Sequence, residues 1–207
     1  MSPAVLALLA YGIGATPTSY WVGSIRGIDL RAEGSKNLGA TNTFRVLGWK
    51  AALPVVFFDV GKGWFVVWAL PLYQNGGAWE WTLAYAAAAI LGHVFSFWVK
   101  FKGGKGVATS AGAFLALAPW AVLFAFVVWL AVAFTTRYVS LASMIALAVA
   151  PIAVYLTPHQ GGDTVLWFTV VLAAFVVWTH RSNLGRLLRG EENRFGASGQ
   201  TAEEAGS

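Results

Sequence analysis

The chain has 207 residues, of which 57% are hydrophobic and 11% charged, and its mean hydropathy is +0.63. Because charged residues make up about a quarter of a soluble domain, this composition indicates an integral membrane protein. The net charge is +5, but so little charge stands outside the loops that nucleic-acid binding is not expected. Cysteine is absent and the three histidines lack metal-ligand spacing, so disulfides, thiolate catalysis and a metal site are not expected either.

Six apolar runs account for most of the chain, and a helix that spans a bilayer needs about 20 such residues. The runs cover residues 3–22, 51–73, 81–99, 107–136, 138–156 and 164–179. Gly12, Gly14 and Pro17 predict a kink in the first run. The run at 107–136 is too long for one crossing and contains Pro119, where we expect it to break.

Lysine and arginine concentrate in some of the polar segments and are missing from others. They occur in residues 23–50, 100–106 and 181–194 but not in residues 74–80 and 157–163. The positive-inside rule therefore places the first three segments in the cytoplasm and the other two outside. Residues 100–106 and the C-terminal segment are then both cytoplasmic, which needs an even number of crossings between them. Only three apolar runs lie there, so the run at 107–136 must form two helices. The sequence thus predicts an all-α integral membrane protein with seven transmembrane helices, its N-terminus outside and its C-terminus cytoplasmic.

One of these seven helices, residues 107–118, would be short and broken. At 1.5 Å per residue it is about 18 Å long, too short to cross a bilayer alone. We therefore expect the loop before it to dip into the bilayer. Irregular backbone at that depth is tolerated where it lines a polar cavity.

The loop before this short helix is rich in glycine and lysine. It contains Lys102, Gly103, Gly104, Lys105 and Gly106. Glycines allow backbone N–H groups to face a ligand, and a helix that begins here adds the positive end of its dipole. The pattern predicts an anion-binding cradle, although a cytoplasmic loop punctuated by glycine explains it equally well. It is not a nucleotide-binding P-loop, because Lys105 is followed by Gly106.

A second polar segment, residues 34–45, combines small residues, hydroxyls and amides with one arginine. Such a mixture suits a phosphate held by N–H groups, hydroxyls and a guanidinium. Its candidate ligands are Ser35, Asn37, Gly39, Thr41, Asn42 and Arg45. The alternative is an interfacial helix capped by Thr41 or Asn42.

Further polar residues cluster near the same predicted membrane surface. His93 lies close to the lysine loop in sequence, and either binds substrate or only forms interfacial hydrogen bonds. Ser140 and Ser143 share a helix face. The segment after the last run carries His180, Arg181, Asn183, Arg186 and Arg189, which indicate either a site or a basic amphipathic helix on anionic lipid.

Asp59 and Lys62 stand three residues apart within the second apolar run, so they are placed to pair on one helix face. A charge pair inside a span counts as a functional hypothesis by default, but a structural ion pair close to the cytoplasmic surface is the favoured interpretation here. No serine stands in a G-x-S-x-G turn, so a covalent serine enzyme is not indicated.

Taken in order, these blocks resemble the bacterial acyl-phosphate:glycerol-3-phosphate acyltransferase family. The matching blocks are Gly34-Ser35-x-Asn37-x-Gly39-Ala40-Thr41-Asn42, Asp59-x-x-Lys62-Gly63, Gly92-His93 with residues 101–109, residues 137–143, and His180-Arg181-x-Asn183 with Arg186-Leu187. The resemblance runs from about residue 11 to 194. Leu38 and Ser96 depart from it where the family often has proline, as does Gly185 where a polar residue is usual.

The resemblance implies a single polytopic catalytic domain over residues 1–194. Residues 195–207 lie outside the resemblance, and their glycine-, serine- and glutamate-rich composition predicts a polar, disordered tail. It implies an enzyme of the bacterial inner membrane whose active site faces the cytoplasm. This enzyme would transfer an acyl group from acyl phosphate to the 1-hydroxyl of sn-glycerol 3-phosphate, giving lysophosphatidate and phosphate, the first step of phospholipid synthesis. We expect direct transfer, no metal or organic cofactor, membrane lipid as the surroundings, and a monomer.

The expected roles follow from the chemistry of two anionic substrates, which must be positioned and neutralised. Ser35, Asn37, Thr41 and the backbone at Gly39 would hold the acyl-phosphate headgroup, next to Lys105 and the N–H groups of Gly103, Gly104 and Gly106. Arg45, Lys105, Ser143, Asn183 and His180 would position glycerol phosphate, with Asn42, Lys102, Ser140 and Arg181 completing the predicted binding set. His93, His180 or the substrate's own phosphate would accept the hydroxyl proton.

Two other classes of protein remain open at this point. A small transporter for an organophosphate would also use basic loops that dip into the bilayer. Transporters usually contain repeats with broken helices in matching positions, and no second copy of the glycine-lysine loop occurs here. A membrane scaffold without activity would not need polar clusters gathered on one side.

Overall fold

The computed structural model describes residues 1–196, and every regular element within them is helical. The first half of the chain forms α1 (Pro3–Gly14), α2 (Thr18–Ile25), α3 (Ala40–Leu47), α4 (Trp49–Ala69), the 3-10 turn η1 (Leu70–Tyr73), α5 (Trp81–Val94) and the 3-10 turn η2 (Phe97–Val99). The second half forms α6 (Val107–Leu117), α7 (Pro119–Thr136), α8 (Val139–Leu156), α9 (Gly162–Thr179) and α10 (Arg181–Leu188). The prediction of an all-α chain is confirmed for this range.

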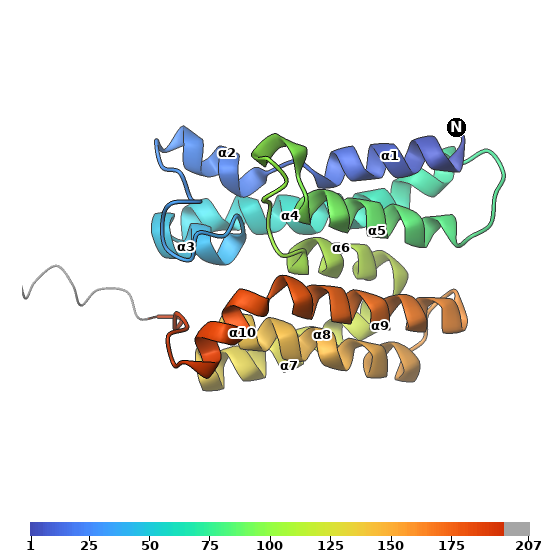
Figure 1. Cartoon of the computed structure of the whole chain (residues 1–207). Coiled ribbons are helices and arrows are strands. Elements are labelled where there is room, and N and C mark those ends of the chain that lie inside the picture. Colours follow the sequence, from blue (N-terminus) through green and yellow to red (C-terminus); the bar gives the residue numbers. More distant parts are fainter. Residues whose placement is uncertain (197–207) are drawn as a thin grey trace, which may run out of the picture.

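The long helices run roughly alongside one another in a single bundle (Figure 1). Helix α1 packs on α5, α4 on α6, α7 on α8, and α8 on α9. The short helices α2, α3 and α10 gather at one end of the bundle, near the loop that precedes α6 (Figure 1). The loops over residues 74–80 and 157–161 lie at the opposite end, so lysine-rich and lysine-free segments are separated along the bundle.

Six segments are long and apolar enough to cross a membrane. They are Pro3–Ile25, Trp49–Tyr73, Trp81–Val99, Pro119–Thr136, Val139–Leu156 and Gly162–Thr179. Large apolar side chains such as Phe57, Trp120 and Trp167 are exposed on the outside of these segments, as expected for surfaces that face lipid rather than water. Helix α6 is apolar but shorter, so a count of seven crossings depends on it.

The predicted kink in the first run and the predicted break in the run at 107–136 both occur at proline. Helix α1 ends at Gly14 and α2 begins after Pro17, while α6 ends at Leu117 and α7 begins at Pro119. Proline cannot donate the helical hydrogen bond, and it pushes the residue before it out of the α conformation. Ala118 accordingly has φ −149° and ψ 70°. The long run therefore divides where the sequence predicts.

Glycine allows the closest helix contacts in the bundle. A Cβ atom on Gly112 of α6 would overlap the carbonyl of Val60 in α4, and one on Gly63 of α4 would overlap the carbonyl of Thr109. Small residues at such interfaces let two backbones approach closely, which stabilises helix pairs in lipid. The pairing of α4 with α6 in turn fixes where the lysine loop enters α6.

The start of α3 differs from the capping alternative. Gly39 is the N-cap, no side chain caps this end, and Thr41 and Asn42 lie inside the helix. The alternative that Thr41 or Asn42 caps the helix is therefore wrong. The predicted polar tail falls almost entirely outside the described residues.

Candidate active site

A cavity of about 740 Å³ lies among the helices and reaches the end of the bundle where α3 and α10 gather. Many predicted site residues line it, namely Ser35, Asn37, Gly39, Thr41, Asn42, Arg45, His93, Lys105, Gly106, Ser140, Ser143, His180 and Asn183. Apolar side chains line the rest, among them Phe114, Val122, Phe126, Leu147 and Leu172. The cavity thus joins a polar, cationic part to an apolar part.

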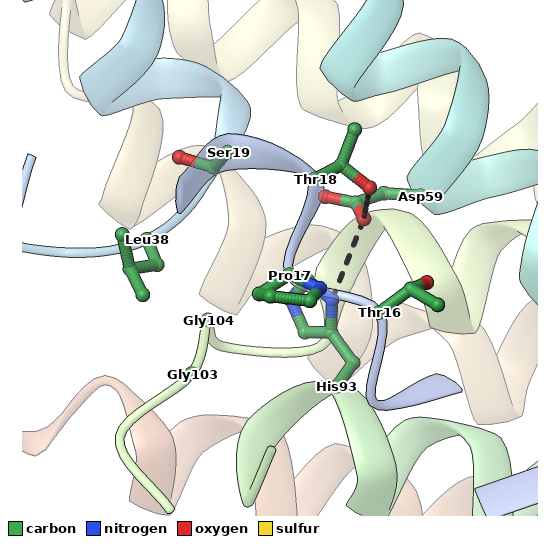
Figure 2. Close-up of a pocket in the computed structure, with 9 residues that line it drawn as sticks. All are labelled: Thr16, Pro17, Thr18, Ser19, Leu38, Asp59, His93, Gly103 and Gly104. Atoms are coloured by element: carbon green, nitrogen blue, oxygen red, sulfur yellow. Dashed lines mark hydrogen bonds and ion pairs between the residues drawn. The ribbon is translucent and has the colours of Figure 1, made fainter. Parts of the chain in front are cut away.

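Four predicted residues do not line this cavity. Lys102 is exposed, and Arg181 is also exposed and stacks 4.4 Å above the ring of Trp178. Gly103 and Gly104 line a separate small cavity of about 10 Å³, shown in Figure 2. Their N–H groups donate to the carbonyls of Val94 and His93 in α5, at 2.9 and 3.1 Å. These two amides are therefore engaged by the protein itself.

The amides that remain available lie at the start of α6. Among residues 1–196, the N–H groups of Lys105, Gly106 and Val107 donate to no protein acceptor, and all three residues line the large cavity. Gly106 is the N-cap with φ 87°, a left-handed conformation that favours glycine. Free N–H groups and the positive end of the helix dipole make this end of α6 a favourable position for an anion.

Lys105 is held from both its backbone and its side chain. Its carbonyl accepts a hydrogen bond from Oγ1 of Thr179 at 3.1 Å, and its ammonium bonds to Oδ1 of Asn183. Burial lowers the pKa of Lys105 to about 8, Glu192 opposes this shift, and two nearby arginines add to it. A second anion in the cavity would favour the charged ammonium.

Arg45 stands in the last turn of α3 and lines the same cavity. Its Nη1 atom is buried and has no hydrogen-bond partner within the described part of the chain. Burial lowers the pKa of Arg45, and Glu192 opposes the shift. A buried donor without a partner is costly, so Nη1 of Arg45 is a candidate donor to a ligand in the cavity.

The side-chain amide of Asn42 forms its hydrogen bonds within the protein, although the residue lines the cavity. Its Oδ1 accepts from the N–H of Ser35 at 2.8 Å, and its Nδ2 donates to the carbonyls of Leu30 and Glu33, each at 3.0 Å. Both donors and the acceptor of this amide are thus in use. Asn42 therefore shapes the loop that carries Ser35 to the edge of the cavity.

His180 ends α9 and is buried. Its Nδ1 lies 2.8 Å from the carbonyl of Val176, so Nδ1–H donates there and Nε2 remains an acceptor. Burial lowers the pKa of His180 to about 4, and the nearby Lys105 adds to the shift. The imidazole is therefore neutral at pH 7.

Glu192 is a functional candidate that the sequence analysis missed. Its buried carboxylate accepts from Ser140 Oγ at 3.0 Å, Asn183 Nδ2 at 2.8 Å and Arg186 Nε at 2.8 Å. It thereby orients residues of α8 and α10 around the cavity. Ser110 was missed as well, although its buried hydroxyl lacks a partner among residues 1–196 and it lines the cavity. Neither residue stands in a pattern that separates it from an ordinary loop or helix position.

The predicted pairing of Asp59 with Lys62 is confirmed. Nζ of Lys62 lies 2.8 Å from Oδ1 of Asp59, and both side chains are buried. Figure 2 shows Asp59 beside His93, whose Nδ1 is 3.6 Å from the same oxygen. Asp59 and His93 line both the large and the small cavity.

Within residues 1–196, these features define a polytopic, helical membrane protein whose cavity has a cationic, hydrogen-bonding part that continues into an apolar part. A family model described as glycerol-3-phosphate acyltransferase matches residues 4–190. The chain belongs to the glycerol-3-phosphate acyltransferase family, as the sequence resemblance implied.

Individual relatives are similar over nearly the whole chain. A glycerol-3-phosphate acyltransferase of Fusobacterium nucleatum is 44% identical over 196 residues, covering 91% of this chain and 95% of the relative. Glycerol-3-phosphate acyltransferase 2 of Moorella thermoacetica is 47% identical over 194 residues, covering 93% and 97%.

Solved structures of PlsY (YgiH), an integral membrane glycerol 3-phosphate acyltransferase, share the fold. Its glycerol 3-phosphate form has a TM-score of 0.85 and 36% identity, and covers 94% of this chain and 96% of its own. Its lysophosphatidic acid form has a TM-score of 0.83 and 35% identity, covering 94% and 95%. The all-helical integral membrane fold is therefore shared along nearly the whole length.

Proposed function

We propose that the protein transfers an acyl group from acyl phosphate to the 1-hydroxyl of sn-glycerol 3-phosphate and releases lysophosphatidate and phosphate. The observation that carries the proposal is the single cavity in which a cationic, hydrogen-bonding part adjoins an apolar part. The polar part suits two phosphate groups, and the apolar part suits an acyl chain. Membership of the glycerol-3-phosphate acyltransferase family supports the acceptor substrate.

Charge neutralisation is the first contribution of the site. Two anionic substrates repel each other, and cationic groups placed beforehand offset this repulsion in a site of low dielectric constant. Arg45 and Lys105 line the cavity, and the free N–H groups at the start of α6 add partial positive charge. Arg186, in contrast, is paired with Glu192. We assign the acyl-phosphate headgroup to the α6 N-terminus and Ser35, and glycerol phosphate to Arg45, Lys105 and Asn183.

The reaction needs no covalent enzyme intermediate, because the acyl group is already activated by its phosphate. The 1-hydroxyl oxygen attacks the acyl carbon, a new C–O ester bond forms, and the bond from the acyl carbon to the phosphate oxygen breaks. The electron pair of that bond leaves with the phosphate. Among residues 1–196, no histidine or carboxylate hydrogen-bonds to Ser35 Oγ, so this serine is not activated as a nucleophile.

The hydroxyl proton must go to an acceptor as the ester forms. Nε2 of His180 is an acceptor, but a pKa near 4 makes the ring a weak base at neutral pH. A phosphate oxygen, with a second pKa of about 6 in phosphate esters, is the better acceptor. We therefore assign the proton to the leaving phosphate and the orientation of the hydroxyl to His180.

The same proposal includes the membrane arrangement. With α6 counted, the chain crosses seven times, its N-terminus is outside and its C-terminus cytoplasmic. The lysine- and arginine-rich segments gather at one end of the bundle, which supports a cytoplasmic site. Water-soluble glycerol 3-phosphate would then enter from the cytoplasm of a bacterium, and the protein would act as a monomer in its inner membrane.

The proposal is tested with purified protein in detergent, palmitoyl phosphate and radiolabelled glycerol 3-phosphate. We expect labelled lysophosphatidate from the wild type and from Arg26→Ala, which alters an exposed arginine, but a large loss in Arg45→Ala. Equal rates for Arg45→Ala and Arg26→Ala would remove Arg45 from the site. Uptake of glycerol 3-phosphate into vesicles without product would instead support a transporter.

A further inference from the structure

Asp59, Lys62 and His93 form a buried cluster that the proposed chemistry does not use. Their side chains are 3%, 6% and 8% exposed, and they come from α4 and α5. Oδ1 of Asp59 lies 2.8 Å from Lys62 Nζ and accepts a hydrogen bond from Thr18 Oγ1 at 3.4 Å. Lys62 Nζ also donates to the carbonyl of Thr16 at 3.0 Å. Because burying charges in a span is costly, such a cluster indicates a function.

The ring of His93 lies between this charge pair and the glycine-lysine loop. Nδ1 faces Asp59 at 3.6 Å (Figure 2). With a hydrogen on Nδ1, the imidazole directs a donor toward this carboxylate. The other ring nitrogen, Nε2, abuts Gly104, because a Cβ atom added to Gly104 would overlap it.

The backbone of His93 supports the same loop. Its carbonyl accepts from Gly104 N–H at 3.1 Å, and the carbonyl of Val94 accepts from Gly103 N–H at 2.9 Å. A Cβ atom added to Gly103 would overlap the His93 carbonyl. The path of the loop is therefore set by close contact with His93, and the next residue along it is Lys105.

The small cavity adjoins these contacts. Its volume of about 10 Å³ is close to what one water molecule needs, and Thr16, Asp59, His93 and Gly104 contribute to its lining (Figure 2). The 3.6 Å between His93 Nδ1 and Asp59 Oδ1 exceeds a direct hydrogen bond, so Asp59 acts on the ring as a nearby negative charge. The glycine-lysine loop thus contacts the Asp59–Lys62–His93 cluster through Gly103 and Gly104. The next residue, Lys105, lines the large cavity.

We propose that Asp59 and His93 are positioning residues for the glycine-lysine loop. Asp59, paired with Lys62, holds the His93 ring against Gly104, and the ring determines where Lys105 presents its ammonium to a substrate phosphate. This inference rests on the proposed function and deepens it. It gives His93 a role distinct from that of proton acceptor, which would require contact with the substrate hydroxyl.

The first test compares His93→Asn with His159→Asn, which changes a histidine in the loop between α8 and α9. In His93→Asn we expect KM for glycerol 3-phosphate to rise by about 10- to 100-fold, since a displacement of about 1 Å in a positioned group costs up to that much. The change in kcat should be smaller, and His159→Asn should match the wild type in both constants. Gly104→Ala should raise the same KM, and its effect should be less than additive with His93→Asn.

The second test concerns Asp59. Asp59→Asn leaves Lys62 buried without its partner, so the double variant Asp59→Asn/Lys62→Met is measured beside it, with Asp163→Asn at the start of α9 as the control. We expect both Asp59 variants to raise KM for glycerol 3-phosphate and the control to leave it unchanged. If neither Asp59 variant changes KM while His93→Asn does, Asp59 is not part of the positioning network.

Two kinetic outcomes would overturn the proposal. A fall in kcat at constant KM in His93→Asn would indicate proton transfer, and a lower melting temperature with unchanged kcat and KM would indicate a purely structural cluster. Direct binding of radiolabelled glycerol 3-phosphate separates this inference from the proposed function. If the wild type forms no lysophosphatidate, the proposed function fails. If His93→Asn and His159→Asn bind glycerol 3-phosphate equally well, the positioning role of His93 is contradicted, whatever the outcome for the proposed function.

Discussion

At the scale of single residues, replacing Arg45 by lysine is the most direct test of the proposed phosphate binding. Arg45 offers a forked guanidinium whose Nη1 lacks a protein partner among residues 1–196. A lysine at this position keeps the charge but cannot form two parallel hydrogen bonds to a phosphate. Comparing the wild type with Arg45→Lys therefore separates the effect of hydrogen-bond geometry from the effect of charge.

We predict that Arg45→Lys lowers kcat/KM by about 10- to 100-fold, because a hydrogen bond to a charged group contributes about 1.5–3 kcal/mol. Steady-state kinetics with both substrates measure the change. The matched control is Arg26→Lys, which alters an exposed arginine. Near-normal kcat/KM in Arg45→Lys would show that the guanidinium does not hold a phosphate.

Lys105 predicts a dependence on pH whose sign follows from its lowered pKa. With a pKa of about 8, Lys105 is a cation below that value and a neutral amine above it. Anion binding should therefore weaken as the pH rises through about 8, and KM for glycerol 3-phosphate should increase there. In Lys105→Arg the increase should disappear, since arginine stays charged. A KM that stays constant in the wild type between about pH 7 and 9.5 would contradict this account.

Much of the candidate site could be predicted at this scale, because its residues stand in short local blocks. Ser35, Arg45, Lys105 and Asn183 all reach the cavity. What each residue touches could not be predicted. Asn42 bonds to its own loop rather than to the cavity, and Glu192 bonds to groups up to 52 residues away in the chain. Such partners depend on how distant helices pack.

At the scale of helices, the contact between α4 and α6 determines where the lysine loop can lie. Gly112 meets the carbonyl of Val60 so closely that a methyl group has no room, whereas Gly61 of α4 has no atom near the same position. The two glycines thus provide a matched pair, one at the helix interface and one outside it.

We predict that Gly112→Ala lowers the melting temperature, because overpacking costs about 1–3 kcal/mol, and that it also reduces activity by moving α6. Gly61→Ala should stabilise by about 0.5–1 kcal/mol, the usual helical advantage of alanine over glycine. Thermal unfolding in detergent measures both changes. Equal melting temperatures for the two variants would show that the contact between α4 and α6 is looser than described.

The helices themselves were largely predictable, because a bilayer imposes a minimum apolar length and proline interrupts helices. The break before Pro119 follows from that rule. Other prolines behave differently, since Pro54 and Pro151 lie within α4 and α8. Neighbouring helices satisfy the backbone groups that an internal proline frees, and sequence alone does not reveal which prolines have such neighbours.

At the scale of the whole molecule, the proposed orientation in the membrane depends on whether α6 is a crossing. Counted as a crossing, this 11-residue helix places the residues around the site and the C-terminus on the same side. The native chain contains no cysteine, so single cysteines report orientation directly.

We predict that Gln74→Cys and Gln160→Cys react with a membrane-impermeant thiol reagent added outside, and that Arg189→Cys reacts only after the membrane is opened. Labelling of intact spheroplasts measures this difference. Reaction of Arg189→Cys from outside would mean that the chain crosses six times rather than seven.

The central claim is that one cavity brings an acyl phosphate and glycerol 3-phosphate together for direct transfer. The measurement that tests it most directly counts phosphate and lysophosphatidate in the same reaction, using purified protein with palmitoyl phosphate and glycerol 3-phosphate. We predict one phosphate per lysophosphatidate, with neither formed when one substrate is omitted. Phosphate released without lysophosphatidate, or lysophosphatidate formed without palmitoyl phosphate, would contradict the account.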